Sequence, residues 1–125
     1  MKRVIVQNRS CPQIRPLVAV YCASFFCRLR GLTFRRFVSP ESGLLLVQGR
    51  DSRVDAAIHM LGVFTDLAIV WINQAGEVVD TCLAKRWRPF YAPRRPARYV
   101  LEMNPGRYRD FHVGDRVSFE YESPA

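Results

Sequence analysis

The chain has 125 residues, the usual size of one domain; 49% of them are hydrophobic and 24% are charged. This balance excludes a disordered chain, and the eight prolines and seven glycines follow no period, which excludes collagen-like and low-complexity classes. The formal charge of +8 lies entirely in the first 50 residues, which hold nine basic residues and one acidic residue. Such a basic region can recruit nucleic acid, anionic lipid or an acidic protein, or it can be a solubilising face.

The N-terminal part of the chain predicts three strands and a helix. Short apolar runs rich in valine and leucine predict strands at residues 3–7, 17–22 and 43–48. Between the last two, apolar residues recur at helical spacing behind Ser24, which is a suitable N-cap. We therefore expect one short helix over residues 24–36.

The middle of the chain predicts a hairpin. Residues 57–63 and 67–72 are apolar runs that predict two strands. Asn73 begins a turn that ends at Gly76, where a positive φ is needed. Since another strand is predicted at 77–83, residues 67–83 are predicted to form a hairpin.

The last part of the chain begins with a proline-rich segment, residues 85–97. Its three prolines exclude a central strand, so it is predicted to be a loop, ordered by Trp87, Phe90 and Tyr91. A strand at 98–103, a helical turn behind Asn104 and Pro105 and a last strand at 116–121 complete the chain. About eight short strands and few helices predict a single, mainly β domain over residues 1–125. Its architecture is expected to be a sandwich or a partly closed barrel.

The four cysteines predict neither a zinc site nor a disulfide framework. They contain no CxxC pair, and no histidine stands at zinc-finger spacing. Cys22 and Cys27 lie in an apolar run and are expected to be small buried hydrophobic residues with reduced thiols. No convincing signal peptide is found, and the long apolar stretch 56–76 carries Asp66 near its middle, which disfavours a membrane span. A cytoplasmic location is expected.

Motifs for catalysis are sparse. The chain has no nucleophile elbow, no glycine-rich phosphate loop and no metal-ligand spacing, so no catalytic residue, cofactor or metal is predicted. His59 and Asp66 flank the start of the central hairpin and are the acid–base pair that a small hydrolase could use. His59 stands between Ile58 and Met60, which is more typical of a structural histidine.

The better candidates are binding residues, in which arginine alternates with aromatic side chains. This pattern suits single-stranded nucleic acid, because the cations contact phosphates and the rings stack on bases. In the alternative interpretation, the rings anchor the helix and loop to the core, and the arginines are solvated or pair with Glu102 or Asp115. The candidate residues are Arg28, Arg30, Arg35, His59, Asp66, Trp87 and Arg88. We expect a non-enzymatic binding or accessory module for a protein or small ligand; nucleic-acid binding and a hydrolase at the His59/Asp66 hairpin are the alternatives.

Four stretches of the chain, in order over about residues 3–120, match the pattern of a known family. They are Arg28-Leu29-Arg30-Gly31-Leu32 with Arg35, Gly43-Leu44-Leu45-Leu46, the hairpin ending in Gly76-Glu77-Val78-Val79, and Ala97-Arg98-Tyr99-Val100-Leu101-Glu102 followed by Val113-Gly114-Asp115-Arg116-Val117. Together they resemble the DUF 192 family, a bacterial and archaeal domain of unknown function. The resemblance implies a compact, mainly β domain of jelly-roll-like sandwich type and implies no activity. Where the family's central turn typically reads Pro-Ile/Leu-Asp, this chain reads Asp66-Leu67-Ala68.

Overall fold

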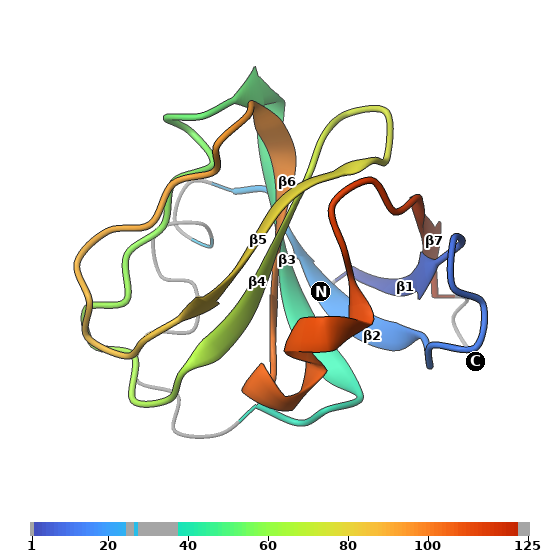
Figure 1. The fold of residues 1–125 in the computed structure, drawn as a ribbon, viewed down its shortest axis with the longest axis horizontal. Helices are drawn as coiled ribbons and strands as arrows, with labels where there is room; N and C mark the ends of the chain where they lie inside the picture. The colour runs from blue at the N-terminus through green and yellow to red at the C-terminus, as the bar shows by residue number, and fades with distance from the viewer. Residues whose placement is uncertain (1, 25–26, 28–37, 123–125) are drawn as a thin grey trace.

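The computed structural model describes residues 2–24, 27 and 38–122 of the chain (Figure 1). These residues form seven strands and one short 3-10 helix, so the prediction of a mainly β protein is confirmed. The strand at 43–48 is longer than predicted, and the one at 57–63 is missing. The elements are β1 (Arg3–Asn8), β2 (Leu17–Cys22), β3 (Ser42–Ser52), β4 (Leu67–Ile72), β5 (Val78–Ala84), β6 (Ala97–Met103), η1 (Pro105–Asp110) and β7 (Val117–Tyr121).

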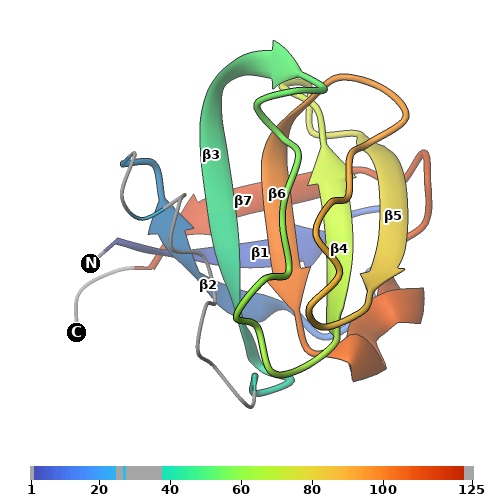
Figure 2. The same cartoon turned by 90° about the vertical axis from the view of Figure 1, so that its left-hand side faces the viewer.

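All seven strands belong to one mixed sheet with the order β5-β4-β6-β3-β2-β1-β7. Neighbouring strands are antiparallel except β2 and β3, which are parallel. The sheet bends strongly, so that β1, β2 and β7 cross behind the wall formed by β3, β6, β4 and β5 (Figure 2). It is not closed into a barrel. The expected jelly-roll-like arrangement is not confirmed.

Two apolar clusters cover the two faces of the sheet, and β4 contributes to both. All six of its residues are buried. Because side chains alternate between faces along a strand, Ile69 and Trp71 enter one cluster while Val70 and Ile72 enter the other. An uninterrupted apolar run is therefore the expected sequence for a strand covered on both sides.

The prediction of a strand at residues 57–63 is wrong, although buried and exposed side chains alternate along this segment as they do in a strand. Ile58 and Met60 are buried while His59 and Leu61 are exposed. The backbone pairs with the loop after β5 instead of a sheet strand, and only one isolated bridge, Ile58 to Tyr91, is formed. The period-2 pattern therefore reports burial of alternate side chains, which a paired loop achieves as well as a strand does.

The predicted hairpin 67–83 is confirmed as β4 and β5, and its turn also contacts β7. Gly76 has φ +86°, as the predicted turn requires, and its carbonyl accepts the Val117 amide at 2.8 Å. A Cβ at Gly76 would lie 2.9 Å from the Val117 carbonyl oxygen. Glycine is thus needed for both the backbone conformation and the close approach.

The expectation of reduced thiols is wrong for Cys22 and Cys27, because these two residues form a disulfide. They are five positions apart in the sequence, and Cys27 packs against the same apolar cluster that contains Cys22. Cys11 and Cys82 are free. The two bonded residues are partly or fully buried, as expected, but they are covalently linked rather than separate hydrophobic side chains.

The expected helix at 24–36 lies mostly outside the described residues and stays a prediction. Its proposed N-cap is described: the Ser24 hydroxyl accepts the Cys27 amide at 3.2 Å. The helical turn after Asn104 is confirmed as η1, where the Asn104 side chain accepts the Gly106 amide. Across the described segments, no helix has the length and apolar character needed to cross a membrane.

Candidate binding surface

Two loops lie side by side over one face of the sheet. The first connects β3 to β4 (residues 53–66) and the second connects β5 to β6 (residues 85–96) (Figure 2). Ile58 and Tyr91 exchange two backbone hydrogen bonds of 2.8 and 2.9 Å, and Met60 makes two more, with Trp87 and Arg88, of 2.9 and 3.0 Å. We call these two segments the paired loops.

The paired loops are fastened to the sheet beneath them. The Trp71 indole N–H donates to the Ala56 carbonyl at 2.8 Å, inside the core. Within the second loop, the Tyr91 hydroxyl accepts the Lys85 amide at 2.7 Å. Alternate side chains of the first loop are buried in the cluster beneath it. The outer surface of the paired loops is therefore held in one conformation by bonds to the fold.

Large apolar side chains stand outward on this fastened surface. Trp87 is 51% exposed and Phe90 is 65% exposed, while Leu61 of the neighbouring loop is 49% exposed. Trp87 contacts Phe64 edge-to-face, with ring centroids 5.4 Å apart. The prediction that the aromatic residues order this loop holds for Tyr91, which packs on the core, but not for Phe90, which is exposed.

Trp87 also has an unusual backbone conformation. Its φ is +66°, and no other non-glycine residue among those described has a positive φ. For a bulky residue this conformation costs about 1–2 kcal/mol. It is maintained by the hydrogen bond from the Trp87 amide to the Met60 carbonyl. The loop thus presents the indole in a position that an unconstrained chain would seldom adopt.

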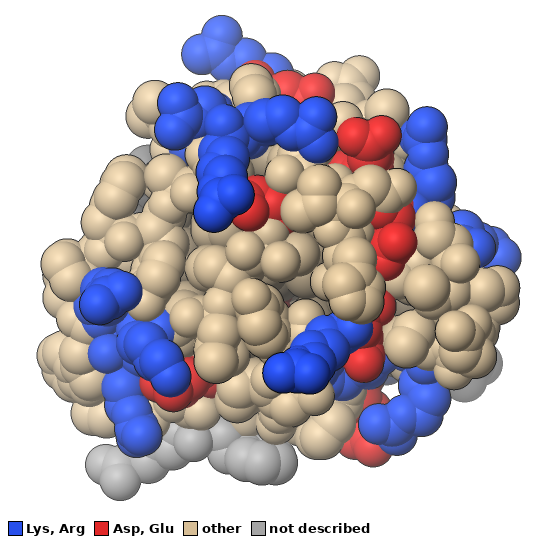
Figure 3. Space-filling model, viewed as in Figure 1, with Lys and Arg blue, Asp and Glu red and all other residues tan. Residues whose placement is uncertain are grey.

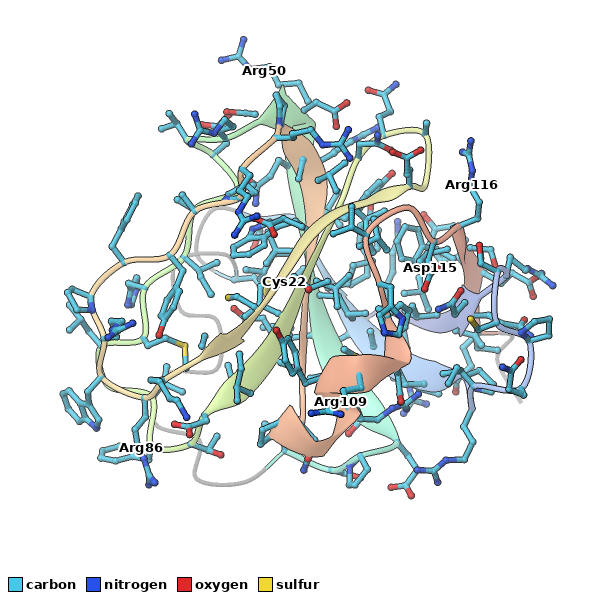
Figure 4. The ribbon with its side chains drawn as sticks, in the orientation of Figure 1. Cys22, Arg50, Arg86, Arg109, Asp115 and Arg116 are labelled. Atoms are coloured by element: carbon cyan, nitrogen blue, oxygen red, sulfur yellow. A yellow bond between two sulfur atoms is a disulfide. The ribbon has the colours of Figure 1, made fainter. Side chains whose placement is uncertain are left out.

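Cations accompany these rings along the second loop. Lys85, Arg86, Arg88, Arg94 and Arg95 are all exposed. In Figure 3, lysine and arginine gather at the lower left and at the top, and Figure 4 places Arg86 at the lower left. The second loop runs between these two places (Figure 1).

Asp66 fixes one end of the second loop. Its Oδ1 accepts the Arg86 amide at 2.9 Å, and its two oxygens lie 3.7 Å from Lys85 Nζ and from Arg86 Nε. This contact places Asp66 next to the loop that carries Trp87. Asp66 acts there as an acceptor that positions the loop.

The His59/Asp66 pair expected for a hydrolase is not formed by any described contact. His59 is exposed on the first loop, and within the described part of the chain no hydrogen bond or ion pair joins it to Asp66. Burial, and then the neighbouring Asp80 carboxylate, raises the pKa of the free Cys82 thiol to about 12, so this thiol is not ionised near neutral pH. Among the described residues, no group of three His, Cys, Asp or Glu side chains could hold a metal ion.

Of the predicted binding arginines, the structure describes Arg88 but not the other three. Arg88 lies on the second loop, exposed, with its guanidinium carbon 5.9 Å from the centre of the Tyr91 ring. Arg28, Arg30 and Arg35 lie outside the described residues and stay predictions.

Comparisons with known proteins agree on one family. The model of the DUF192 family, described as "Uncharacterized ACR", matches residues 6–119. A UPF0127 protein of Pyrococcus furiosus is 34% identical over 101 residues, covering 79% of this chain and 84% of the relative. The chain belongs to the DUF192 family. A UPF0127 protein of Thermococcus gammatolerans is 35% identical over 99 residues, covering 78% of this chain but 63% of that relative's length.

Solved structures share the fold of this DUF192 protein. One, from Sinorhizobium meliloti 1021, is provisionally described as a transcription regulator; its TM-score is 0.80 with 24% identity, over 94% of this chain and 92% of that one. Another, of unknown function from Novosphingobium aromaticivorans, has a TM-score of 0.77 with 21% identity, over 93% and 83%. At these identities the likeness concerns the fold. The family itself is uncharacterised.

One position of the DUF192 pattern has a structural role near η1. Asp115 Oδ2 accepts the His112 amide and the Asn8 side-chain amide, both at 2.9 Å. Asn8 is buried, and its Oδ1 accepts the amides of Ser10 and Cys11. The Asp115 carboxylate, which the alternative interpretation of the sequence gave as an arginine partner, instead joins the end of β1 to the turn before β7.

Glu102, another position of the DUF192 pattern, was not recognised from the sequence as exceptional. It lies in β6 opposite Leu44 of β3 and Ile69 of β4, and it is 4% exposed. Among the described residues, its Oε1 has no hydrogen-bond partner. Burial raises the pKa of Glu102 to about 7. The signal that could have identified Glu102 was a carboxylate within a predicted apolar strand of a sheet whose other strands are also apolar.

Proposed function

We propose that this protein is a non-enzymatic binding module that contacts its partner through the outer surface of the paired loops. The single observation that carries the proposal concerns Trp87: its side chain is half exposed, while its backbone is held at a positive φ that costs conformational energy. Strain of this kind persists where the surrounding structure enforces it, and it is concentrated at functional positions.

The composition of the surface supports the same conclusion. Tryptophan and arginine are the residue types most enriched among side chains that dominate binding energy at protein interfaces. Here an exposed tryptophan is flanked in sequence by Arg86 and Arg88, and Phe90 follows two residues later. Because hydrogen bonds already fasten this backbone, binding would order few additional groups and would lose little entropy.

The hydrolase alternative has less support. An acid–base mechanism needs a pair of groups within hydrogen-bond reach of the reacting atoms. Asp66 is instead engaged by the Arg86 amide and two cations, and His59 projects from the neighbouring loop without a described partner. The contacts of Asp66 favour a positioning role over proton transfer.

Photo-crosslinking tests the proposed surface without knowledge of the partner. Phe90 would be replaced by the photo-crosslinking residue benzoylphenylalanine in the source cells. Tyr108 of η1, which is 37% exposed, provides a matched aromatic control position. We expect a discrete macromolecular adduct from position 90 and none from position 108. Absence of an adduct at 90, or the same adducts from both positions, would overturn the proposal.

A further inference from the structure

We infer that the partner of the paired loops is a single-stranded nucleic acid. This inference rests on the proposed function and specifies the ligand class of the same surface. It is drawn from the described residues of the second loop alone, where cations and exposed rings follow one another along a fastened backbone.

The charge of the second loop fits a polyanion that runs along it. Five cations lie between residues 85 and 95, and this segment contains no acidic residue. Neighbouring carboxylates occupy some of them: Asp66 lies near Lys85 and Arg86, and Glu77 lies 3.5 Å from Arg95. Arg88 has no carboxylate partner among the described residues. Three to five phosphates could therefore be contacted.

The exposed rings fit unstacked bases. Trp87 and Phe90 stand on either side of the Arg88-Pro89 dipeptide, and both are at least half exposed. Phe64 meets the indole edge-to-face at an interplanar angle of 77°, so the two rings are not stacked on each other. Aromatic side chains stack on the bases of single strands, whereas the bases of a duplex are stacked on one another.

An acidic protein segment would satisfy the cations but would not use the flat rings in the same way. Its carboxylates would pair with arginine, as Asp66 and Glu77 already do, and stacking surfaces would contribute little discrimination. A single strand engages both kinds of side chain, since phosphates alternate with bases along its length. The alternation of cation and ring between residues 85 and 90 therefore favours nucleic acid.

Fluorescence anisotropy with defined probes tests the inference. The probes are labelled 12-nucleotide oligouridylate RNA, oligothymidylate DNA, a 12-base-pair DNA duplex and a 12-residue polyglutamate peptide. Each is titrated with the intact protein in 50 and 200 mM salt. Contacts to three to five phosphates of a single strand predict that affinity falls about 20- to 130-fold between these salt concentrations.

Two variants separate the contributions of charge and stacking. Arg88→Gln should reduce the magnitude of the salt slope by about 0.7, the contribution of one phosphate contact. Trp87→Ala should weaken single-strand binding about 5- to 150-fold at both salt concentrations and leave the slope unchanged. Arg109→Gln, an exposed arginine on η1, is the control and should bind like the wild type (Figure 4). Circular dichroism of each variant establishes that it is folded.

The possible outcomes are distinct. Preferential binding of the single strands, with these two variant effects, supports the inference. No single-strand binding in 50 mM salt, equal or tighter binding of the duplex or polyglutamate, or an Arg109→Gln effect equal to that of Arg88→Gln would overturn it. A protein adduct at position 90 that resists nuclease would also overturn it while leaving the proposed binding surface intact. Absence of a crosslinked adduct at position 90 would overturn both the proposed binding surface and this inference.

Discussion

Arg107 of η1 and Arg88 of the paired loops have opposite surroundings in one fold. Arg107 is 3% exposed, and its guanidinium donates to the Asp110 carboxylate and to the carbonyls of Pro40 and Arg15. Arg88 is exposed and lies against one aromatic ring. The first arginine joins segments that are distant in sequence, while the second is available to a partner. Residue type alone therefore does not distinguish an arginine that holds the fold together from an exposed one; the number of N–H groups that are hydrogen-bonded within the fold does.

The largest effect is expected when the structural arginine is removed. Arg107→Met should destabilise the fold by about 3–5 kcal/mol, because the Asp110 carboxylate and two carbonyl oxygens lose their donors. Urea unfolding measures the change. Arg109→Met in the same 3-10 helix is the matched control, with an expected change within about 0.5 kcal/mol. Equal losses for the two variants would refute the role assigned to Arg107.

Glu102 extends the comparison to a buried carboxyl group whose Oε1 has no partner among the described residues, and its replacement should stabilise the protein at neutral pH. Burial raises its pKa to about 7, so the protonated form is favoured in the folded state. As the pH rises from about 4.5 to about 7, the unfolded chain ionises before the folded one, and the folded state loses about 3 kcal/mol. This loss is complete above pH 7 and absent below about pH 4.5.

Glu102→Gln tests this pH dependence. The neutral amide should remove the loss, so the variant should be more stable than the wild type by about 3 kcal/mol at pH 8, and this advantage should disappear near pH 4. Urea unfolding at several pH values measures both curves. Parallel curves over pH 4–8 would show that Glu102 does not titrate in this range.

The comparison also shows which features could be predicted from the sequence. All seven strands of the described residues follow from apolar runs bounded by turn residues, because burial on one or both faces determines those patterns. The partner of residues 57–63 could not be predicted, since alternating burial does not say whether a strand or a loop lies alongside. The isolation of Glu102 depends on Leu44 and Ile69 being its register partners, which is a property of the assembled sheet.

The candidate surface was predicted in part for a similar reason. Trp87 and Arg88 follow from local alternation of rings and cations. The role of Asp66 depends on a contact with the Arg86 amide 20 residues away, and no local pattern indicates it. The exposure of Phe90, and the presence of Leu61 beside Trp87, emerge only when two distant loops pair.

A moderate effect is expected when the fastening of the paired loops is weakened. Asp66→Ala removes the acceptor of the Arg86 amide and both nearby ion pairs, and should cost about 1 kcal/mol, since the ion pairs are exposed. Asp66→Asn keeps an acceptor oxygen and should cost less. Hydrogen exchange should speed up at the Arg86 and Trp87 amides in the alanine variant. Unchanged exchange there would show that Asp66 does not hold the loop.

The smallest effect on stability is expected at the arginine assigned to binding. Arg88→Gln should change the free energy of unfolding by less than about 0.5 kcal/mol, because the exposed Arg88 side chain lies against the Tyr91 ring and makes no ion pair among the described residues. Urea unfolding of this variant beside Arg107→Met measures the contrast directly. A loss above about 1 kcal/mol would place Arg88 with Arg107 as a structural arginine. If stability holds while the salt dependence of single-strand binding falls, the two arginines differ in function because one has its N–H groups satisfied within the fold and the other does not.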